Sequence, residues 1–254
     1  MSSLSFAGDS TSYIAIASSN DTKMGTGDFT IEWYQYQTDS NAFPRIFQIG
    51  NYPTTSIGAS IELGSFYFWT AGSFRGGVSV GSYKNSWVHF AIVRSSGTTR
   101  VYKNGTLLFT AFSDSTNYNS SLDLLIGNET NRSNGAAFGG YMAYFHIIKG
   151  EAKYTSNFTV SNTFPTASAG TVYLLKTSGN VGSNITVSNV GTNPSLPSGF
   201  VTDSPPPTTL VVVIPRVLSP AYTMNHLVFY KPGTVSSTTG STSVSNSRAK
   251  ARRT

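Results

Sequence analysis

Short hydrophobic stretches alternate with turn-forming residues along most of the chain, and none repeats its apolar residues with the 3.6-residue period of an amphipathic helix. Several stretches alternate apolar and polar residues, as strands with one buried face do, and others are apolar throughout. Glycine-containing pairs such as Gly76-Gly77 and Ser96-Gly97 separate them. The pattern predicts an all-β protein of antiparallel strands. The predicted strands are residues 4–6, 13–17, 29–37, 45–49, 60–63, 65–69, 77–80, 87–94, 99–103, 106–109, 122–126, 140–148 and 171–175.

The clearest of these signals lies in residues 86–108, SWVHFAIVRSSGTTRVYKNGTLL. Its first part, residues 87–93, is apolar on both alternating faces, which predicts a strand buried on each side. Asn104-Gly105 lies between two further predicted strands and suits a two-residue type I′ turn, because both central residues of that turn need a positive φ. The stretch carries no catalytic residue, so it indicates the fold and leaves the chemistry open.

The composition changes after about residue 176. Residues 177–199 are rich in Gly, Asn, Ser, Thr and Val, and the three prolines at 205–207 form a stiff, extended spacer. We therefore expect a β-sandwich domain over residues 1–178 and an extended C-terminal arm over residues 179–254.

The C-terminal extension allows two interpretations. Its apolar stretches at residues 210–214 and 226–230 are each long enough for a strand. They either belong to an arm that becomes ordered against a partner or pack back onto the domain, and the sequence favours neither. The last part is rich in Ser and Thr, a composition typical of disorder. It ends in a basic tail, whose charged residues are Arg248, Lys250, Arg252 and Arg253.

The chain carries little charge for its length. Asp, Glu, Lys and Arg make up 11% of its 254 residues, less than half of the usual share of about 25%. Such a surface suits a β protein outside a crowded cytosol, or one packed against other proteins. The net charge is +6, and the basic residues outside the tail are mostly scattered singly. Contact with nucleic acid is therefore expected only through the tail, which can equally be a solvated, mobile terminus.

The sequence excludes several classes of site. It contains no cysteine, which rules out a disulfide framework and any zinc or redox site built on thiolates. Its N-terminus lacks the features of a secretory signal peptide, and no apolar run reaches the length of a membrane span. We therefore expect a soluble chain with no membrane span. Neither a nucleophile elbow, a P-loop nor an EF-hand sequence occurs.

Four segments in order resemble the concanavalin A-like lectin/glucanase superfamily, in its laminin-G-like or pentraxin-like branch. They are SLSFAGDSTSYIAI at residues 3–16, GTGDFTIEWYQY at 25–36, the stretch 86–108, and GGYMAYFHIIKGEAKYTSNFT at 139–159. The resemblance covers roughly residues 3–176 and implies a jelly-roll sandwich of two antiparallel sheets. The fourth segment also resembles virion proteins of tailed phages and large DNA viruses.

The chain departs from this superfamily in its acidic residues. Members often carry an acidic pair in the fourth segment, where this chain has Ala143 and Tyr144. Calcium-binding members use acidic and amide residues in loops, and the matching candidates here are Asp114, Asn128 and Glu129. No cofactor is expected to be required, and the resemblance leaves a calcium ion as an option.

Catalytic groups are sparse. Glycoside hydrolysis needs two carboxylates facing one cleft, and the spacing that places them on one strand face in the glucanase relatives is absent. Glu32 and Glu62 lie singly on different predicted strands, where we expect exposed side chains. Each of His89, His146 and His226 lies in or beside an apolar stretch, which favours hydrogen-bonded strand residues over metal ligands. We predict a noncatalytic protein.

Lectin sites combine an aromatic ring that stacks on a sugar with amides that bond its hydroxyl groups. The polar region of residues 114–138 offers both, and loops on a rigid scaffold are common binding sites. The predicted sugar contacts are Tyr118, Asn119, Asn128, Asn131 and Phe138. The alternative for the rings is that they cover the edges of the sandwich.

Two functional hypotheses follow. The main one is a structural protein of a virus particle, such as a minor capsid, decoration or fibre component, located in the virion and bound to other virion or capsid proteins. The alternative is a carbohydrate-binding module or adhesin that recognises host or cell-surface glycans. A glycan hydrolase is the least favoured, because the paired carboxylates are missing.

Overall fold

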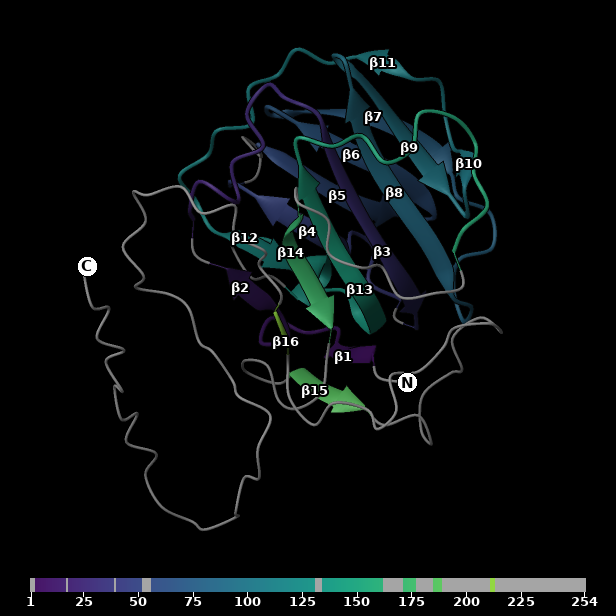
Figure 1. Ribbon diagram of the computed structural model, residues 1–254. Helices are drawn as coiled ribbons and strands as arrows, with labels where there is room; N and C mark the ends of the chain where they lie inside the picture. Colours follow the sequence, from purple (N-terminus) through teal and green to yellow (C-terminus); the bar gives the residue numbers. More distant parts are fainter. Residues whose placement is uncertain are drawn as a thin grey trace, which may run out of the picture. The chain divides into compact units, whose positions relative to one another are not determined.

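The computed structural model (Figure 1) describes residues 3–16, 18–38, 40–51, 56–130, 134–161, 171–176, 185–188 and 211–212. All of them belong to one unit, Met1–Tyr222; a second unit, Thr223–Thr254, lies outside the described residues together with the basic tail and His226. The described strands form two antiparallel sheets packed face to face, so the predicted all-β sandwich is confirmed. Within this part of the chain, no helix is long and apolar enough to cross a bilayer.

The larger sheet, sheet A, contains the longest strands. Its strands are β1 Ser3–Ala7, β3 Phe29–Gln37, β8 Val88–Ser95, β9 Thr98–Lys103, β10 Thr106–Leu107, β11 Phe112–Ser113, β13 Gly139–Lys149, β14 Thr171–Lys176, β15 Ile185–Ser188 and β16 Val211–Val212. They lie in the order β10-β9-β8-β3-β13-β1-β15, while β11 pairs with β9, and β14 pairs with both β13 and β16.

The smaller sheet, sheet B, lies behind sheet A in the view of Figure 1. Its strands are β2 Ile14–Ile16, β4 Arg45–Ile49, β5 Ile57–Glu62, β6 Ser65–Thr70, β7 Ser73–Ser79 and β12 Leu124–Ile126. They lie in the order β2-β12-β4-β5-β6-β7. A short 3₁₀ helix, Asn134–Ala136, precedes β13.

The core between the sheets follows from the alternation along each strand. On β3, Ile31 and Trp33 point inward, while Glu32 and Tyr34 point to the opposite face of sheet A. Trp33 is fully buried and lies near the centre of the core. Its ring centroid is 5.9, 5.6 and 6.2 Å from those of Phe47, Phe90 and Phe145. These contacts join both sheets into one hydrophobic core.

The turn predicted at Asn104-Gly105 is present between β9 and β10. Their φ angles are 48° and 78°, as a type I′ turn requires. A Cβ atom at Gly105 would lie 1.9 Å from the Phe158 carbonyl oxygen, so only glycine fits there. The turn is thus fixed both by its own backbone and by a segment more than fifty residues away in the sequence.

Two short strands lie beyond the predicted domain end at residue 178. β15 pairs with β1, although no strand is predicted at residues 185–188. β16 lies within the apolar stretch 210–214 and pairs with β14. This pairing is the one expected if the stretch packs back onto the domain. The boundary at residue 178 stays a prediction.

Candidate functional site

The outward face of sheet B carries an aromatic surface. On β6, Phe66 and Phe68 point into the core, so Tyr67 and Trp69 point away from it. Trp69 lies directly opposite Phe74 of the edge strand β7, which places both side chains on the same face. We call Tyr67, Trp69 and Phe74 the aromatic platform.

Phe74 contacts both other rings of the aromatic platform. The Phe74 centroid lies 5.1 Å from that of Tyr67 and 5.6 Å from that of Trp69. Tyr67 and Trp69 are half-buried, whereas Phe74 is 53% exposed. Exposed rings on rigid strands offer apolar faces on which a flat ligand can stack.

Polar residues of β4 and β5 fix the Trp69 indole. Its Nε1 donates to Ser60 Oγ over 2.9 Å, and the Arg45 guanidinium lies 5.0 Å from the ring centroid. Ser60 donates to Glu62 Oε1 over 2.8 Å, and Arg45 forms an ion pair with the same carboxylate. The platform is therefore held in place before any ligand arrives, and Glu62, which is half-buried, lies beside it as a hydrogen-bond acceptor.

The loop after β12 is held against β4 on the same face. Arg45 Nε lies 4.0 Å from Glu129 Oε2, and the Thr130 hydroxyl donates to the Gly50 carbonyl over 2.8 Å. Gln48 of β4 donates to that carbonyl as well, also over 2.8 Å. Side-chain contacts thus run from the aromatic platform through Arg45 to the loop.

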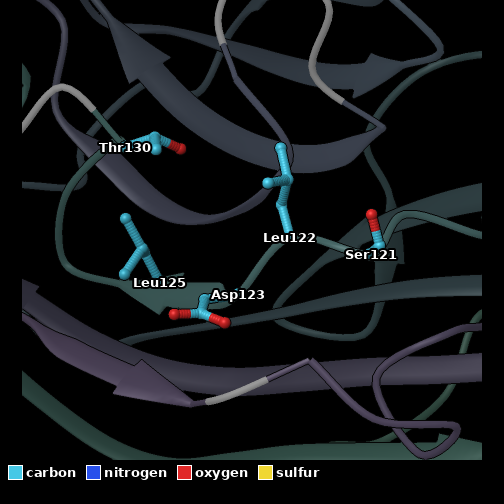
Figure 2. Close-up of a pocket in the computed structure, with 5 residues that line it drawn as sticks. All are labelled: Ser121, Leu122, Asp123, Leu125 and Thr130. Atoms are coloured by element: carbon cyan, nitrogen blue, oxygen red, sulfur yellow. The ribbon is translucent and has the colours of Figure 1, made fainter.

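A pocket of about 170 Å³ opens beside this loop (Figure 2). Figure 2 shows its five side chains, which are those of Ser121, Leu122, Asp123, Leu125 and Thr130. Two leucines supply apolar contact, and a carboxylate and two hydroxyls supply polar groups. This mixture matches the chemistry of a sugar ring, which presents hydroxyl groups at its rim and C–H groups on its faces. The pocket lies inside the region 114–138 that the sequence predicted.

Two of the predicted sugar contacts lie in the core. Tyr118 is 1% exposed and Phe138 is 0% exposed. The Tyr118 hydroxyl lies 2.8 Å from both Asp114 Oδ2 and Thr70 Oγ1, and burial raises its pKa. Phe138 packs edge-on against Phe6, with centroids 5.6 Å apart. Neither ring shows a face to solvent, so neither can stack on a sugar, and both belong to the hydrophobic core.

The three predicted amide contacts do not come together. Asn119 is exposed. Asn128 is fully buried, where its Nδ2 lies 3.4 Å from the Asp9 carbonyl and its Oδ1 accepts the Glu129 N–H over 2.8 Å. Asn131 lies outside the described residues. A role for Asn131 in sugar binding stays a prediction.

The three predicted calcium ligands do not fit a common centre. Asp114 is buried near Arg94, where its Oδ2 accepts a hydrogen bond from Thr99 Oγ1 over 2.7 Å. Glu129 lies beside Arg45 instead. Among residues with a described position, no group of three or more His, Asp or Glu could hold a metal ion. We therefore assign no metal to these residues.

Glu32 corrects the expectation of an exposed strand side chain, because it is 2% exposed. Its Oε1 lies 3.0 Å from His146 Nδ1 and 2.6 Å from Lys153 Nζ. Its Oε2 accepts a hydrogen bond from the Tyr154 hydroxyl over 2.9 Å and lies 3.5 Å from His89 Nε2. Two of the three histidines thus bond a buried carboxylate, as expected of hydrogen-bonded strand histidines. We call Glu32 and these four partners the Glu32 cluster.

The charge of Glu32 is stabilised by its partners. Burial alone would favour the neutral acid, but hydrogen bonds from His146 and His89 and the charge of Lys153 outweigh it. Together they hold the pKa of Glu32 well below its usual range. Burial, followed by the Glu32 charge, raises the pKa of the Tyr154 hydroxyl.

Residues 151–161, which we call the strap, cover the Glu32 cluster on the outward face of sheet A. Thr30 Oγ1 donates to the Glu151 carbonyl over 2.9 Å, and the Phe158 N–H donates to the Gly105 carbonyl over 2.9 Å. The rings of Tyr154 and Phe158 are stacked with centroids 3.5 Å apart. The strap therefore occupies the aromatic and charged part of this face with the protein's own side chains.

The aromatic platform was not predicted, because binding residues were expected in loops and these rings lie on strands. Tyr67 and Trp69 belong to the predicted strand 65–69, and the hexapeptide SFYFWT alternates two buried phenylalanines with two outward aromatics. An aromatic residue at the outward position of an alternating strand was the available signal.

The residues 8–155 match the family profile described as "Concanavalin A-like lectin/glucanases superfamily". No protein among curated sequences matches the chain.

Solved structures similar to this chain include three proteins. The first is described as "a putative carbohydrate binding protein from Bacteroides ovatus". It aligns with a TM-score of 0.54 and 16% identity over 74% of this chain and 59% of that one. The second, a heptameric SAP-like pentraxin from Limulus polyphemus, aligns with a TM-score of 0.48 and 14% identity over 60% of this chain and 77% of that one. The third, domains LG4-5 of the mouse laminin alpha1 chain, aligns with a TM-score of 0.44 and 14% identity over 62% of this chain and 45% of that one.

Proposed function

Because the chain belongs to the concanavalin A-like lectin/glucanase superfamily, we propose that it binds carbohydrate on the outward face of sheet B without transforming it. The observation that carries this proposal is the aromatic platform. Its three rings face outward, and Phe74, which is 53% exposed, contacts the other two. A sugar would stack on these rings, and Glu62 would accept hydrogen bonds from its hydroxyl groups.

The Bacteroides ovatus neighbour supports this proposal through its name alone, since the low identity establishes only a shared fold. The chain spans 59% of that protein. The ligand of this chain therefore has to be determined by experiments on this chain.

Binding without catalysis is the form of the proposal that the charges on this face favour. Glycoside hydrolysis needs one carboxyl group that gives a proton and another that acts as base or nucleophile. Here Glu62 and Glu129 both lie against the Arg45 guanidinium, and Glu62 also accepts a hydrogen bond from Ser60. Ion-paired carboxylates serve ligand positioning better than proton donation.

A glycan array followed by titration calorimetry tests the proposal. We expect binding to a subset of glycans, with loss of at least about tenfold in affinity for Trp69→Ala, because a stacked aromatic is commonly a dominant contact. Trp87→Ala is the matched control, since Trp87 is also half-buried but contacts Tyr36 on the sheet A side. Absence of binding to every glycan, or equal losses for both variants, would rule the proposal out.

The role as a structural protein of a virus particle, with virion partners and location, stays a prediction. Neither the family nor the similar structures point to a virus. Its test is to delete residues 200–254 and measure incorporation into particles, which the assembly role predicts to fall.

A further inference from the structure

The pocket of Figure 2 and the aromatic platform lie on the same face of sheet B, and we propose that they are two subsites for one uncharged glycan. The platform stacks one part of the glycan, and the pocket holds a further sugar ring. This inference rests on the proposed function and adds the number of subsites and the class of glycan.

Strand register places the two subsites a short distance apart. Leu125 in the pocket lies opposite Gln48, Gln48 opposite Gly58, and Gly58 opposite Trp69. Leu125 and Trp69 are therefore three strands apart, which corresponds to about 14 Å at the usual strand spacing. Their separation suits an oligosaccharide and exceeds the size of a single sugar ring.

Side-chain contacts connect the two subsites. Phe74 contacts Trp69, the Arg45 guanidinium lies over the Trp69 ring, and Arg45 lies 4.0 Å from Glu129. Glu129 directly precedes Thr130, which lines the pocket. A ligand lying along this path stays over ordered side chains from one subsite to the other.

The pocket has the size and groups for one sugar ring. Its volume of about 170 Å³ lies below the range of about 300–1,000 Å³ typical of drug-sized ligands. Asp123 Oδ1 accepts the Ser18 N–H over 3.0 Å, which fixes the carboxylate, and a carboxylate offers about four acceptor positions in all. Asp123 can therefore accept hydroxyl groups, while Leu122 and Leu125 contact the C–H faces of the ring.

The local charge selects against anionic glycans. Among the residues that the structure describes along the path, three carboxylates, those of Glu62, Asp123 and Glu129, stand against one cation, Arg45, so their sum is −2. Arg75 of β7 lies over the Phe112 ring of sheet A, at 5.5 Å from its centroid. The described part of the path is thus negative although the whole chain has a net charge of +6, and this part would repel a sulfated or uronate-rich glycan.

Calorimetric titration of the purified full chain with glycans of increasing length tests the inference. The uncharged probes are the gluco-oligosaccharide series of cellulose, laminarin and starch and the xylan series, and the anionic probes are heparin and polygalacturonate oligomers. We expect affinity for an uncharged series to rise with length until both subsites are filled, because the second contact becomes intramolecular. The anionic probes should bind at least about tenfold more weakly.

Asp123→Asn isolates the pocket. We expect it to lower the affinity for long oligosaccharides about tenfold, as loss of hydrogen bonds to a charged group does, and to leave short ones that fill only the platform unchanged. Asp28→Asn is the matched control, because Asp28 Oδ1 also accepts a backbone N–H, that of Ser96, over 2.8 Å. Circular dichroism spectra of the two variants check that both are folded.

The outcomes separate the two proposals. If Trp69→Ala abolishes binding while Asp123→Asn binds long glycans as tightly as the unaltered protein, the pocket subsite is disproved and the proposed function stands. A preference for heparin or polygalacturonate overturns the selection for uncharged glycans. If no glycan of any length binds, the proposed function fails and this inference fails with it.

Discussion

The outward faces of the two sheets carry similar residues in opposite situations. On sheet A, the strap lies over Glu32, and the rings of Tyr154 and Phe158 stack within the protein. On sheet B, Arg45, which forms an ion pair with Glu62, lies over the Trp69 ring of the aromatic platform, and the platform reaches solvent through Phe74. Aromatic and charged residues on an outward face thus serve internal packing where a segment covers them and are available to a ligand where no described segment does.

The largest expected effect concerns the covered face. Glu32→Gln removes a charge that His146, His89 and Lys153 surround, so we expect unfolding free energy to fall by about 3 kcal/mol. Chemical denaturation measures it. Glu62→Gln, which removes the partner of Arg45 on sheet B, should cost clearly less, and an equal or larger loss would contradict the distinction between the faces.

Glu32→Gln should also change how the stability of the protein depends on pH in acid. The pKa of Glu32 is lower in the folded protein than the value near 4.5 that the unfolded chain has. The unfolded state therefore binds more protons in acid, so stability from this group is complete above about pH 4.5 and is lost as the pH falls below it. Denaturation curves across this range should show a shallower loss for Glu32→Gln than for the unaltered protein. Identical slopes would show that Glu32 does not contribute.

The next effect tests the strap itself. Gly105→Ala places a Cβ 1.9 Å from the Phe158 carbonyl oxygen, so the strap must shift, and we expect a loss of about 2 kcal/mol with faster hydrogen exchange in residues 151–161. Gly97→Ala is the control, since Gly97 has a similar φ of 72° but its Cβ would lie 4.0 Å from the nearest atom, the Asp114 carbonyl oxygen. Equal losses in the two variants would mean that backbone strain, rather than the strap contact, sets the cost.

The sequence predicted most of the sandwich because its strands are locally encoded. The predicted strands 29–37 and 45–49 coincide with β3 and β4. Both strands are buried along nearly their whole length. β15, with the sequence ITVS, alternates apolar and polar residues over only four positions, too short a signal to predict a strand, and its pairing with β1 depends on a partner far away in the chain.

The site was predicted less well because exposure depends on distant segments. Glu32 was expected to be exposed, yet the strap that covers it begins more than a hundred residues later. Tyr118 and Phe138 lie in apparently polar loops but turn inward to close the core. The pocket was predicted only as part of a long polar region, whose shape the sequence does not specify.

The smallest expected effect on stability concerns the open face. Phe74→Ala removes a ring that is 53% exposed, so we expect the unfolding free energy to change by less than about 0.5 kcal/mol while glycan affinity falls. Phe158→Ala, on the covered face, should do the reverse, because Phe158 packs against Tyr102 and Tyr154. Thermal denaturation measures the stability of both variants, and calorimetric titration measures their affinity for the glycan.

The chain's three tryptophans allow the most direct test of the central claim, that a glycan binds the outward face of sheet B. Trp33 lies in the core, Trp69 in the aromatic platform and Trp87 beside Tyr36 on the sheet A side. In a nitrogen-15 NMR titration with a bound glycan, we predict that the Trp69 indole N–H signal shifts while those of Trp33 and Trp87 stay. A shift of the Trp87 signal with an unchanged Trp69 signal would contradict the account.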